Sequence, residues 1–107
     1  MSVTDLMGTA AGLAEAWNSR ELGRVGEARV KVLRMDEMPV EEESHAAAEA
    51  LLVLDGRLEL TVDGVEIPVR QGELFMVPAR TVHAVRPGST GTLVIVELPE
   101  GRGTEEE

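Results

Sequence analysis

The sequence predicts an all-β domain with a short helix in front of it. Between residues 28 and 98, short runs of alternating apolar and polar residues recur, which is the pattern of half-buried strands. Glycine and proline interrupt these runs at intervals of roughly ten residues, so about seven or eight strands are expected, arranged as a sandwich or barrel. The residues before position 20 show helical spacing instead.

The amino-terminal segment carries the predicted helix. The apolar residues that share one helical face between positions 4 and 17 are Leu6, Ala10, Leu13 and Trp17. Ser2 or Thr4 could cap the start of the helix, and Gly23 lies beyond its end. Two internal glycines each cost about 1 kcal/mol relative to alanine, so we expect the helix to dock on the domain or on a second subunit through Trp17. Residues 1–27 are therefore expected to form a helix and an arm.

The predicted strands begin at residue 28. Alternating runs cover residues 28–32, 58–62 and 65–69, and shorter apolar runs cover 74–77, 82–85 and 93–98. Asp63 and Gly64 form the two-residue signal of a type I′ turn and predict a hairpin between the second and third runs. Pro68 then requires an edge strand or a bulge, because it cannot donate to a ladder hydrogen bond.

The barrel is assigned to residues 28–98. No apolar residue follows Leu98, and residues 99–107 are expected to form a disordered acidic tail. A length of 107 residues favours a single domain. One segment is ambiguous, because residues 44–52 have the composition of a helix, with Ser44 as a possible N-cap, inside a region that otherwise reads as strands.

Composition excludes several classes of function. The chain carries 20 acidic and 10 basic residues, a formal net charge of −10 at pH 7, and this field repels phosphate backbones and anionic lipids. The only aromatic residues, Trp17 and Phe75, offer no platform for stacked bases, so no nucleic acid partner is expected. No apolar run approaches the roughly 20 residues of a membrane span, and no basic cluster marks a secretory signal. We therefore expect no membrane association and a cytoplasmic location.

The chemistry available to a site is also restricted. The chain has no cysteine, which excludes disulfides, thiolate metal sites and a cysteine nucleophile. No serine lies in a nucleophile elbow, and no glycine spacing matches a phosphate-binding loop. A metal site would have to use the two histidines, carboxylates or water.

The first of two informative groups of residues surrounds one of these histidines. Three residues separate His45 from Glu49, and six separate Glu49 from Gly56. This spacing resembles the first motif of the cupin family, HxH, three or four residues, Glu, six residues, Gly. The sequence departs from the motif at Glu43, which stands where the first histidine would be.

The second group resembles the second cupin motif, Gly, five residues, PxG, two residues, His. Five residues separate Gly72 from Pro78, and His83 follows at the expected position. Arg80 stands where the glycine of PxG would be, and Pro87 stands where the family often has an asparagine. Both groups occur in the expected order, with the predicted hairpin between them.

The resemblance covers roughly residues 28–98 and implies a small double-stranded β-helix, a jelly-roll barrel with a site inside its wider mouth. Residues 46–54 would then be a strand. The resemblance further implies a divalent metal ion (Fe, Mn, Ni or Zn) held by His45, Glu49 and His83. Glu43 would be a fourth ligand or a catalytic general base. It also implies a homodimer, which would cover the exposed edges of a small open barrel.

The residue types support a metal site independently of the family. Two imidazoles and one carboxylate suit Fe(II), Zn, Mn or Ni. On one straight strand, His45 and Glu49 would lie about 13 Å apart, so a shared ion requires a bend between them. Residues 46–48 contain no Gly, Pro or Asn to mark such a bend. On a helix the same two residues would share a face without one.

Two functions from different classes follow. The first is a metal-dependent enzyme, dioxygenase-like or isomerase-like, that acts on a small molecule. The second is a non-catalytic module that binds or senses a small molecule, without a metal; a weaker third is an interaction protein that pairs subunits through Trp17. Arg80 and Arg86 could hold an anionic substrate at the mouth, although turn arginines are more often surface charges. The scarcity of aromatic residues predicts little surface on which an aromatic ring could stack.

Overall fold

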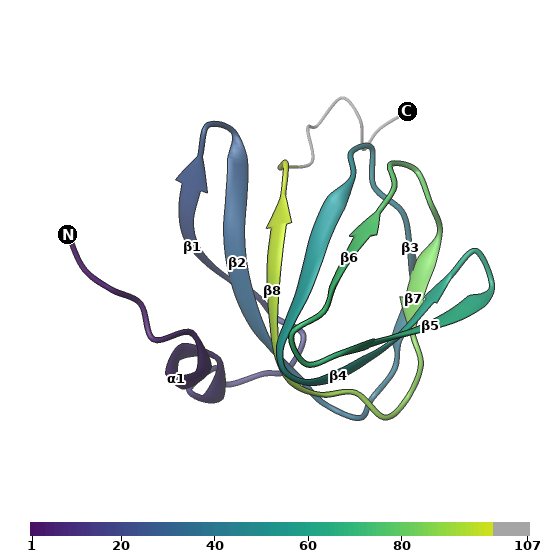
Figure 1. Cartoon of the computed structure of the whole chain (residues 1–107), viewed down its shortest axis with the longest axis horizontal. Coiled ribbons are helices and arrows are strands. Elements are labelled where there is room, and N and C mark those ends of the chain that lie inside the picture. Colours follow the sequence, from purple (N-terminus) through teal and green to yellow (C-terminus); the bar gives the residue numbers. More distant parts are fainter. Residues whose placement is uncertain (100–107) are drawn as a thin grey trace.

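The computed structural model describes residues 1–99, and within them eight strands form one curled antiparallel sheet (Figure 1). The helix is α1 (Leu6–Ala11), and the strands are β1 (Arg20–Val25), β2 (Ala28–Met35), β3 (Val40–Glu43), β4 (Glu49–Val62), β5 (Val65–Arg70), β6 (Leu74–Val77), β7 (His83–Val85) and β8 (Thr90–Glu97). The strand order is β1-β2-β8-β4-β7-β3, and β5 and β6 also pair with β4. The predicted all-β fold with a short amino-terminal helix is confirmed.

Strand β4 connects the two walls of the curled sheet. Its first part pairs with β6 and β8, and its last part pairs with β5 and β7. The register with β8 shifts between Val53 and Asp55, beside a close crossing of Gly56 and Gly91. Both glycines have positive φ, and a Cβ on Gly56 would overlap the Thr90 carbonyl. The glycine of the first motif is therefore required where β4 bends.

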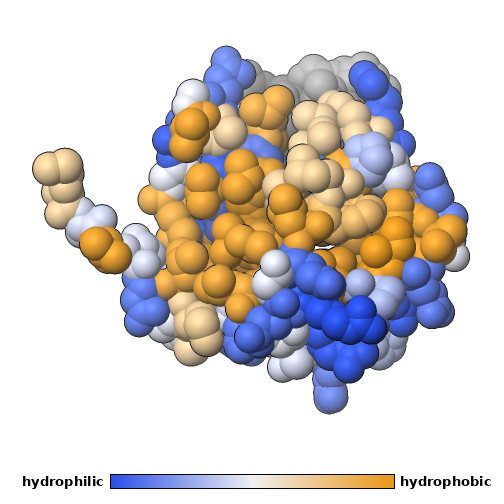
Figure 2. Space-filling model, viewed as in Figure 1, coloured by the Kyte–Doolittle hydropathy of each residue, from blue (hydrophilic) through white to orange (hydrophobic). Residues whose placement is uncertain are grey.

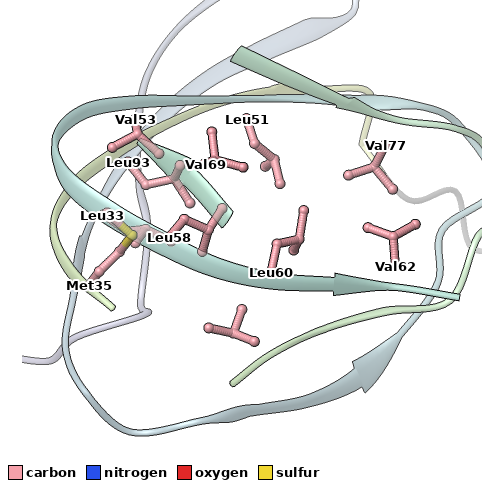
Figure 3. Packing of buried hydrophobic residues seen from close by; sticks show 11 residues of the cluster. Leu33, Met35, Leu51, Val53, Leu58, Leu60, Val62, Val69, Val77 and Leu93 are labelled. Carbon is pink, nitrogen blue, oxygen red and sulfur yellow. The ribbon is translucent and has the colours of Figure 1, made fainter. Parts of the chain in front are cut away.

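The core lies between the two walls. Figure 3 shows side chains from both parts of β4 pointing toward one another, for example Leu51 and Leu60. The buried members of this cluster are Leu33, Met35, Leu51, Val53, Leu58, Leu60, Val62, Val69, Val77, Val85 and Leu93. They occupy alternate positions along their strands, so the period-two pattern in the sequence marks the residues that line the barrel.

The hairpin predicted from Asp63 and Gly64 is present. Val62 pairs with Val65, and both turn residues have positive φ, 49° and 79°, as a type I′ turn requires. Pro68 lies on β5, whose only partner in the described sheet is β4. The prediction of an edge strand at Pro68 is therefore confirmed.

The helix is shorter than its periodicity predicts. It ends at Ala11, and its N-cap is Asp5, whose side chain accepts a hydrogen bond from the Gly8 amide (3.1 Å), rather than Ser2 or Thr4. Only Ala10 is buried, and it packs against Val32 and Val94 on the outside of the sheet. Gly12 is the C-cap, and the chain beyond it contacts the barrel, where Arg34 donates to the Leu13 carbonyl (3.2 Å).

Trp17 lies outside the helix, in a left-handed conformation with φ of 66°. Its backbone N–H donates to the Arg34 carbonyl (2.8 Å), and its indole packs against the barrel core. The prediction that Trp17 anchors the helix is therefore wrong, because the residue belongs to the barrel. Strand β1, which pairs with β2, was not expected within residues 1–27, and Gly23 lies in it beside a register shift.

The ambiguous segment is not a helix. Residues 44–48 form a loop with bends at Ala46 and Ala47, and β4 begins at Glu49. The strand implied for residues 46–54 therefore starts three residues late. The predicted tail lies, apart from Pro99, outside the described residues. Within residues 1–99, no helix is long and apolar enough to cross a lipid bilayer.

Candidate metal centre

The structure brings together all four residues that the sequence singled out. Glu43 ends β3, His45 lies in the loop that follows, Glu49 begins β4, and His83 begins β7. Strands β3 and β7 are neighbours, and Glu43 pairs with His83 in the ladder. Two segments 38 residues apart in the chain (83 − 45) are therefore joined at one end of the barrel.

The bend required between His45 and Glu49 is present at Ala46 and Ala47. It brings His45 Nε2 to 3.8 Å from Glu49 Oε2. The Arg80 amide donates to the His45 carbonyl (2.7 Å) and ties the bent loop to the second motif. Arg80 has φ of 59°, so this position needs the left-handed conformation that the family's glycine adopts without strain.

Three of the four side chains, Glu43, His45 and His83, are close enough to share one ion. His45 Nε2 lies 2.9 Å from Glu43 Oε1, and His83 Nε2 lies 3.1 Å from Glu49 Oε2. One donor atom from each of Glu43, His45 and His83 lies within 4.8 Å of the other two. Ligands bonded at about 2.1 Å to one ion lie about 3 to 4.2 Å apart. Glu43, His45 and His83 therefore form a group that could hold a divalent ion, and Glu49 Oε2 lies near both of its imidazoles without belonging to that group.

The hydrogen bonds of His83 fix the orientation of its ring. Its Nδ1 lies 3.0 Å from the Thr81 carbonyl, which can only accept, so Nδ1 carries a proton. In the neutral ring, Nε2 is then a lone pair that faces Glu49 Oε2 at 3.1 Å. Two acceptors at this distance require a cation between them, either a proton or a metal ion. A carbonyl on the far nitrogen is also the usual support of a metal-binding histidine.

His83 and Glu49 are both buried, so each depends on the other to stabilise its charge. Glu49 is 6% exposed and His83 is 8% exposed, so neither charge is solvated by bulk water. The hydrogen bond to Glu49 raises the pKa of His83 above its usual 6.5, against the opposing effect of burial. Burial acts to raise the pKa of Glu49, but the His83 hydrogen bond and the charges of both histidines outweigh it, so the pKa falls below 4.5.

A cavity of about 230 Å³ opens beside this cluster. Its apolar lining consists of Trp17, Leu33, Val40, Leu51, Leu58, Leu60, Val85, Leu93 and Ile95. Its polar lining consists of Ser19, Glu43, His45, Glu49, His83 and Glu97. The cavity thus has an apolar wall and a cluster of possible metal ligands.

Three polar or aromatic residues of the lining were not predicted: Trp17, Ser19 and Glu97. Glu97 lies opposite Glu49 in the β4–β8 ladder and forms a 2.6 Å ion pair with Lys31. The sequence does contain a signal for Glu97, because this charged residue continues the alternating inward positions of Leu93 and Ile95. For Trp17 and Ser19, no sequence pattern reveals that the chain passes beside the cavity.

The comparisons with known proteins identify the family and the fold. Residues 29–99 match the family described as "Cupin domain". No protein with a curated description matches the sequence.

Several crystal structures are similar to most of the chain. A cupin-2 domain-containing protein from Shewanella frigidimarina has a TM-score of 0.79 and 16% identity, over 91% of this chain and 95% of that one. A protein from Neisseria meningitidis has a TM-score of 0.78 and 21% identity, over 92% and 100%. A conserved Streptococcus pyogenes protein of unknown function has a TM-score of 0.73 and 24% identity, over 94% and 90%. At these identities the likeness concerns the fold.

The cupin match spans most of the chain, from residue 29 to residue 99. This protein belongs to the cupin family.

Proposed function

We propose that the protein binds a divalent metal ion through His45, Glu49 and His83, with Glu43 as a fourth ligand. The observation that carries this proposal is the pairing of His83 and Glu49. Nδ1 is committed to the Thr81 carbonyl, so Nε2 presents a lone pair to a buried carboxylate oxygen 3.1 Å away. Two imidazoles with one or two carboxylates suit iron, manganese, nickel or zinc.

The cavity beside the cluster supports a small molecule as substrate or ligand. A divalent ion at this site would polarise a carbonyl or activate oxygen or water, as dioxygenase-like or isomerase-like chemistry requires. The chain's own contribution is to hold the substrate against the apolar wall and to exclude water from it. Glu43 is the most exposed of the four groups, with 48% of its side chain accessible, and it could also take a proton from the substrate.

A non-catalytic binding role is the second candidate. It is favoured by the mutual pairing of Glu43 with His45 and of Glu49 with His83, because protonated imidazoles would satisfy both carboxylates without an ion. The identity of the metal separates the two roles. Iron favours oxygen chemistry, whereas zinc, manganese or nickel favours isomerisation, and failure to bind any metal favours the binding module.

The experiment that tests the proposal is elemental analysis of tag-free protein, as purified and after loading with each metal in turn. We expect close to one ion per chain in the wild type and at least about tenfold weaker binding in His83→Ala and Glu49→Gln. Glu41→Gln, on the same strand as Glu43 but outside the cluster, is the matched control and should bind as the wild type does. A folded wild type that takes up no metal would overturn the proposal.

We also propose that the protein is a homodimer, formed through the outer face of the sheet. Val96 pairs with Val30, Val94 with Leu52, and Leu52 with Leu74, so these apolar residues share one face. Figure 2 shows apolar residues gathered over the side that carries β1, β2 and β8. An antiparallel sheet normally keeps one face polar. Two copies pairing through this face would bury it and keep most of the chain's negative charge outside.

The cytoplasmic location remains a prediction from the sequence.

A further inference from the structure

The cavity has no arginine or lysine among its lining residues. Neither Arg80 nor Arg86, the two candidates for an anion site, is among these residues. Arg86 instead forms an ion pair with Glu59 (3.2 Å). The nearby cation Lys31 is held by Glu97 at 2.6 Å. A phosphate or a dicarboxylate would therefore find no arginine or lysine clamp in this cavity.

The charges at the polar end balance one another once the proposed ion is bound. Glu43 and Glu49 carry two negative charges, which a divalent ion neutralises, and Lys31 neutralises Glu97. Apart from the ion itself, no group of the lining would offer an unpaired charge to an anion or a cation that lost its hydration on entering this cavity. The net charge of −10 on the whole chain further disfavours anions.

Trp17 provides a fixed part of the apolar wall. Its Nε1 donates to Asp36 Oδ1 (2.9 Å), and its backbone N–H donates to the Arg34 carbonyl (2.8 Å). Asp36 Oδ1 also accepts from the Met38 amide (2.9 Å), so the acceptor itself is held. The polar atom of the indole is thus engaged away from the cavity, and its carbon surface remains for a ligand.

We infer that the cavity takes a small, uncharged and mainly apolar molecule that packs against Trp17 and presents one carbonyl or hydroxyl oxygen to the histidine–glutamate cluster. This inference deepens the proposed metal-binding function. It rests on that function for one point, namely that the oxygen meets a bound metal ion in the cluster. The cavity volume of about 230 Å³ limits the ligand to a small molecule. It lies below the roughly 300 to 1,000 Å³ of sites for drug-sized ligands.

The test uses four probes with the same five-carbon skeleton: pentanamide, pentanoate, pentylamine and glutarate. Trp17 is the only tryptophan in the chain, so its fluorescence reports occupancy of the cavity directly. Each probe is titrated into the zinc-loaded full-length protein, and the zinc content is measured separately. We expect pentanamide to quench or shift the emission with a Kd at least about tenfold below those of pentanoate and pentylamine, and glutarate to bind most weakly.

Pentanoate, pentylamine or glutarate binding as tightly as pentanamide would overturn the assignment, and so would a lack of response to pentanamide. The same titration of the metal-free protein, comparing pentanamide with pentanoate, distinguishes this failure from failure of the metal site. If neither zinc nor any of the other metals binds, the proposed function fails, but the preference for pentanamide over pentanoate must still be present.

A variant that adds a cation to the wall tests the cause of the preference. Val40 is half-buried and lines the cavity, so Val40→Arg should improve pentanoate binding at least about tenfold relative to pentanamide. Val65→Arg, in the exposed hairpin and outside the lining, is the matched control and should leave the ratio unchanged. A folded Val40→Arg protein without this gain would contradict the charge argument; the wild-type titrations remain decisive if that variant does not fold.

Discussion

Nε2 of His83 faces Oε2 of Glu49 across 3.1 Å, and both side chains are buried. The other nitrogen of the ring is hydrogen-bonded to the Thr81 carbonyl at 3.0 Å, so the ring cannot turn a proton toward Glu49 without becoming charged. The pair therefore holds either a proton or a metal ion. We therefore expect both the stability of the protein and its proposed affinity for a metal ion to depend on pH.

Without metal, the pair should stabilise the fold in a limited pH window. The pKa of His83 is raised, so its contribution is complete below 6.5 and disappears as the pH rises through the higher pKa of the folded state. The pKa of Glu49 is lowered, so its contribution is complete above 4.5 and disappears as the pH falls through the lower folded value. The thermal midpoint of the metal-free wild type should therefore exceed that of His83→Gln most clearly between pH 4.5 and 6.5. A constant difference across pH 4 to 9 would contradict this pairing.

The affinity for the metal ion should rise with pH, whereas the stabilisation that His83 gives the metal-free fold falls as the pH rises. A metal ion must displace the proton that Glu49 stabilises on His83. Because the pKa of His83 is raised, protons already compete with the metal ion at pH values above 6.5. The affinity should fall by about tenfold per pH unit below that pKa, as one competing proton predicts. Competition with a chromophoric chelator between pH 5 and 8.5 measures it. An affinity independent of pH over this range would exclude histidine as a ligand.

The positions of the site residues could be predicted because motif spacing determines them. His45, Glu49 and His83 were identified from spacing, and the structure places them together with Glu43. The bend that brings His45 to Glu49 could not be predicted from the alanines at 46–48, because a distant backbone group, the Arg80 amide, helps to hold it. Helical propensity in this segment is overridden by tertiary contacts.

The apolar wall of the cavity also shows which features a local sequence pattern can predict and which it cannot. Periodicity correctly predicts β2, β5, β6, β7, β8 and the second half of β4, since alternation is a local property of each strand, but it predicts neither β3 nor the first half of β4. It places Trp17 on a helix, because the spacing from Leu6 onward continues past the point where the helix ends. The left-handed conformation of Trp17 and its hydrogen bond to Asp36 arise from the folded barrel, and no local pattern encodes them.

The crossing of β4 and β8 should be intolerant of a side chain. Gly56 has φ of 83°, and a Cβ there would overlap the Thr90 carbonyl, so Gly56→Ala should lower the free energy of unfolding by about 3 kcal/mol or more. Gly64 has a similar φ of 79° with no atom within 4 Å, so Gly64→Ala should cost only about 1 to 2 kcal/mol. Urea unfolding of the two variants separates steric overlap from backbone strain. Equal losses would mean that the close crossing does not contribute.

The proposed dimer should depend on the outer face of the sheet. Val96 lies between Val30 and Ala50 on that face, so Val96→Lys should place two charges in the interface of a two-fold dimer and raise its Kd at least about tenfold. Val65→Lys, on the hairpin, provides the control. Sedimentation velocity over a range of concentrations measures both. A wild type that stays monomeric at high micromolar concentration would contradict the dimer.

The most direct test of the proposed metal centre is extended X-ray absorption fine structure, measured at the zinc edge on protein loaded with one equivalent of zinc. We expect two imidazole nitrogens and one or two carboxylate oxygens bound to the zinc at about 2.0 to 2.2 Å, with outer-shell scattering from the histidine rings. In His83→Ala this scattering should fall by half, with Glu41→Gln unchanged. A shell of oxygen alone, without scattering from imidazole, would contradict ligation by His45 and His83.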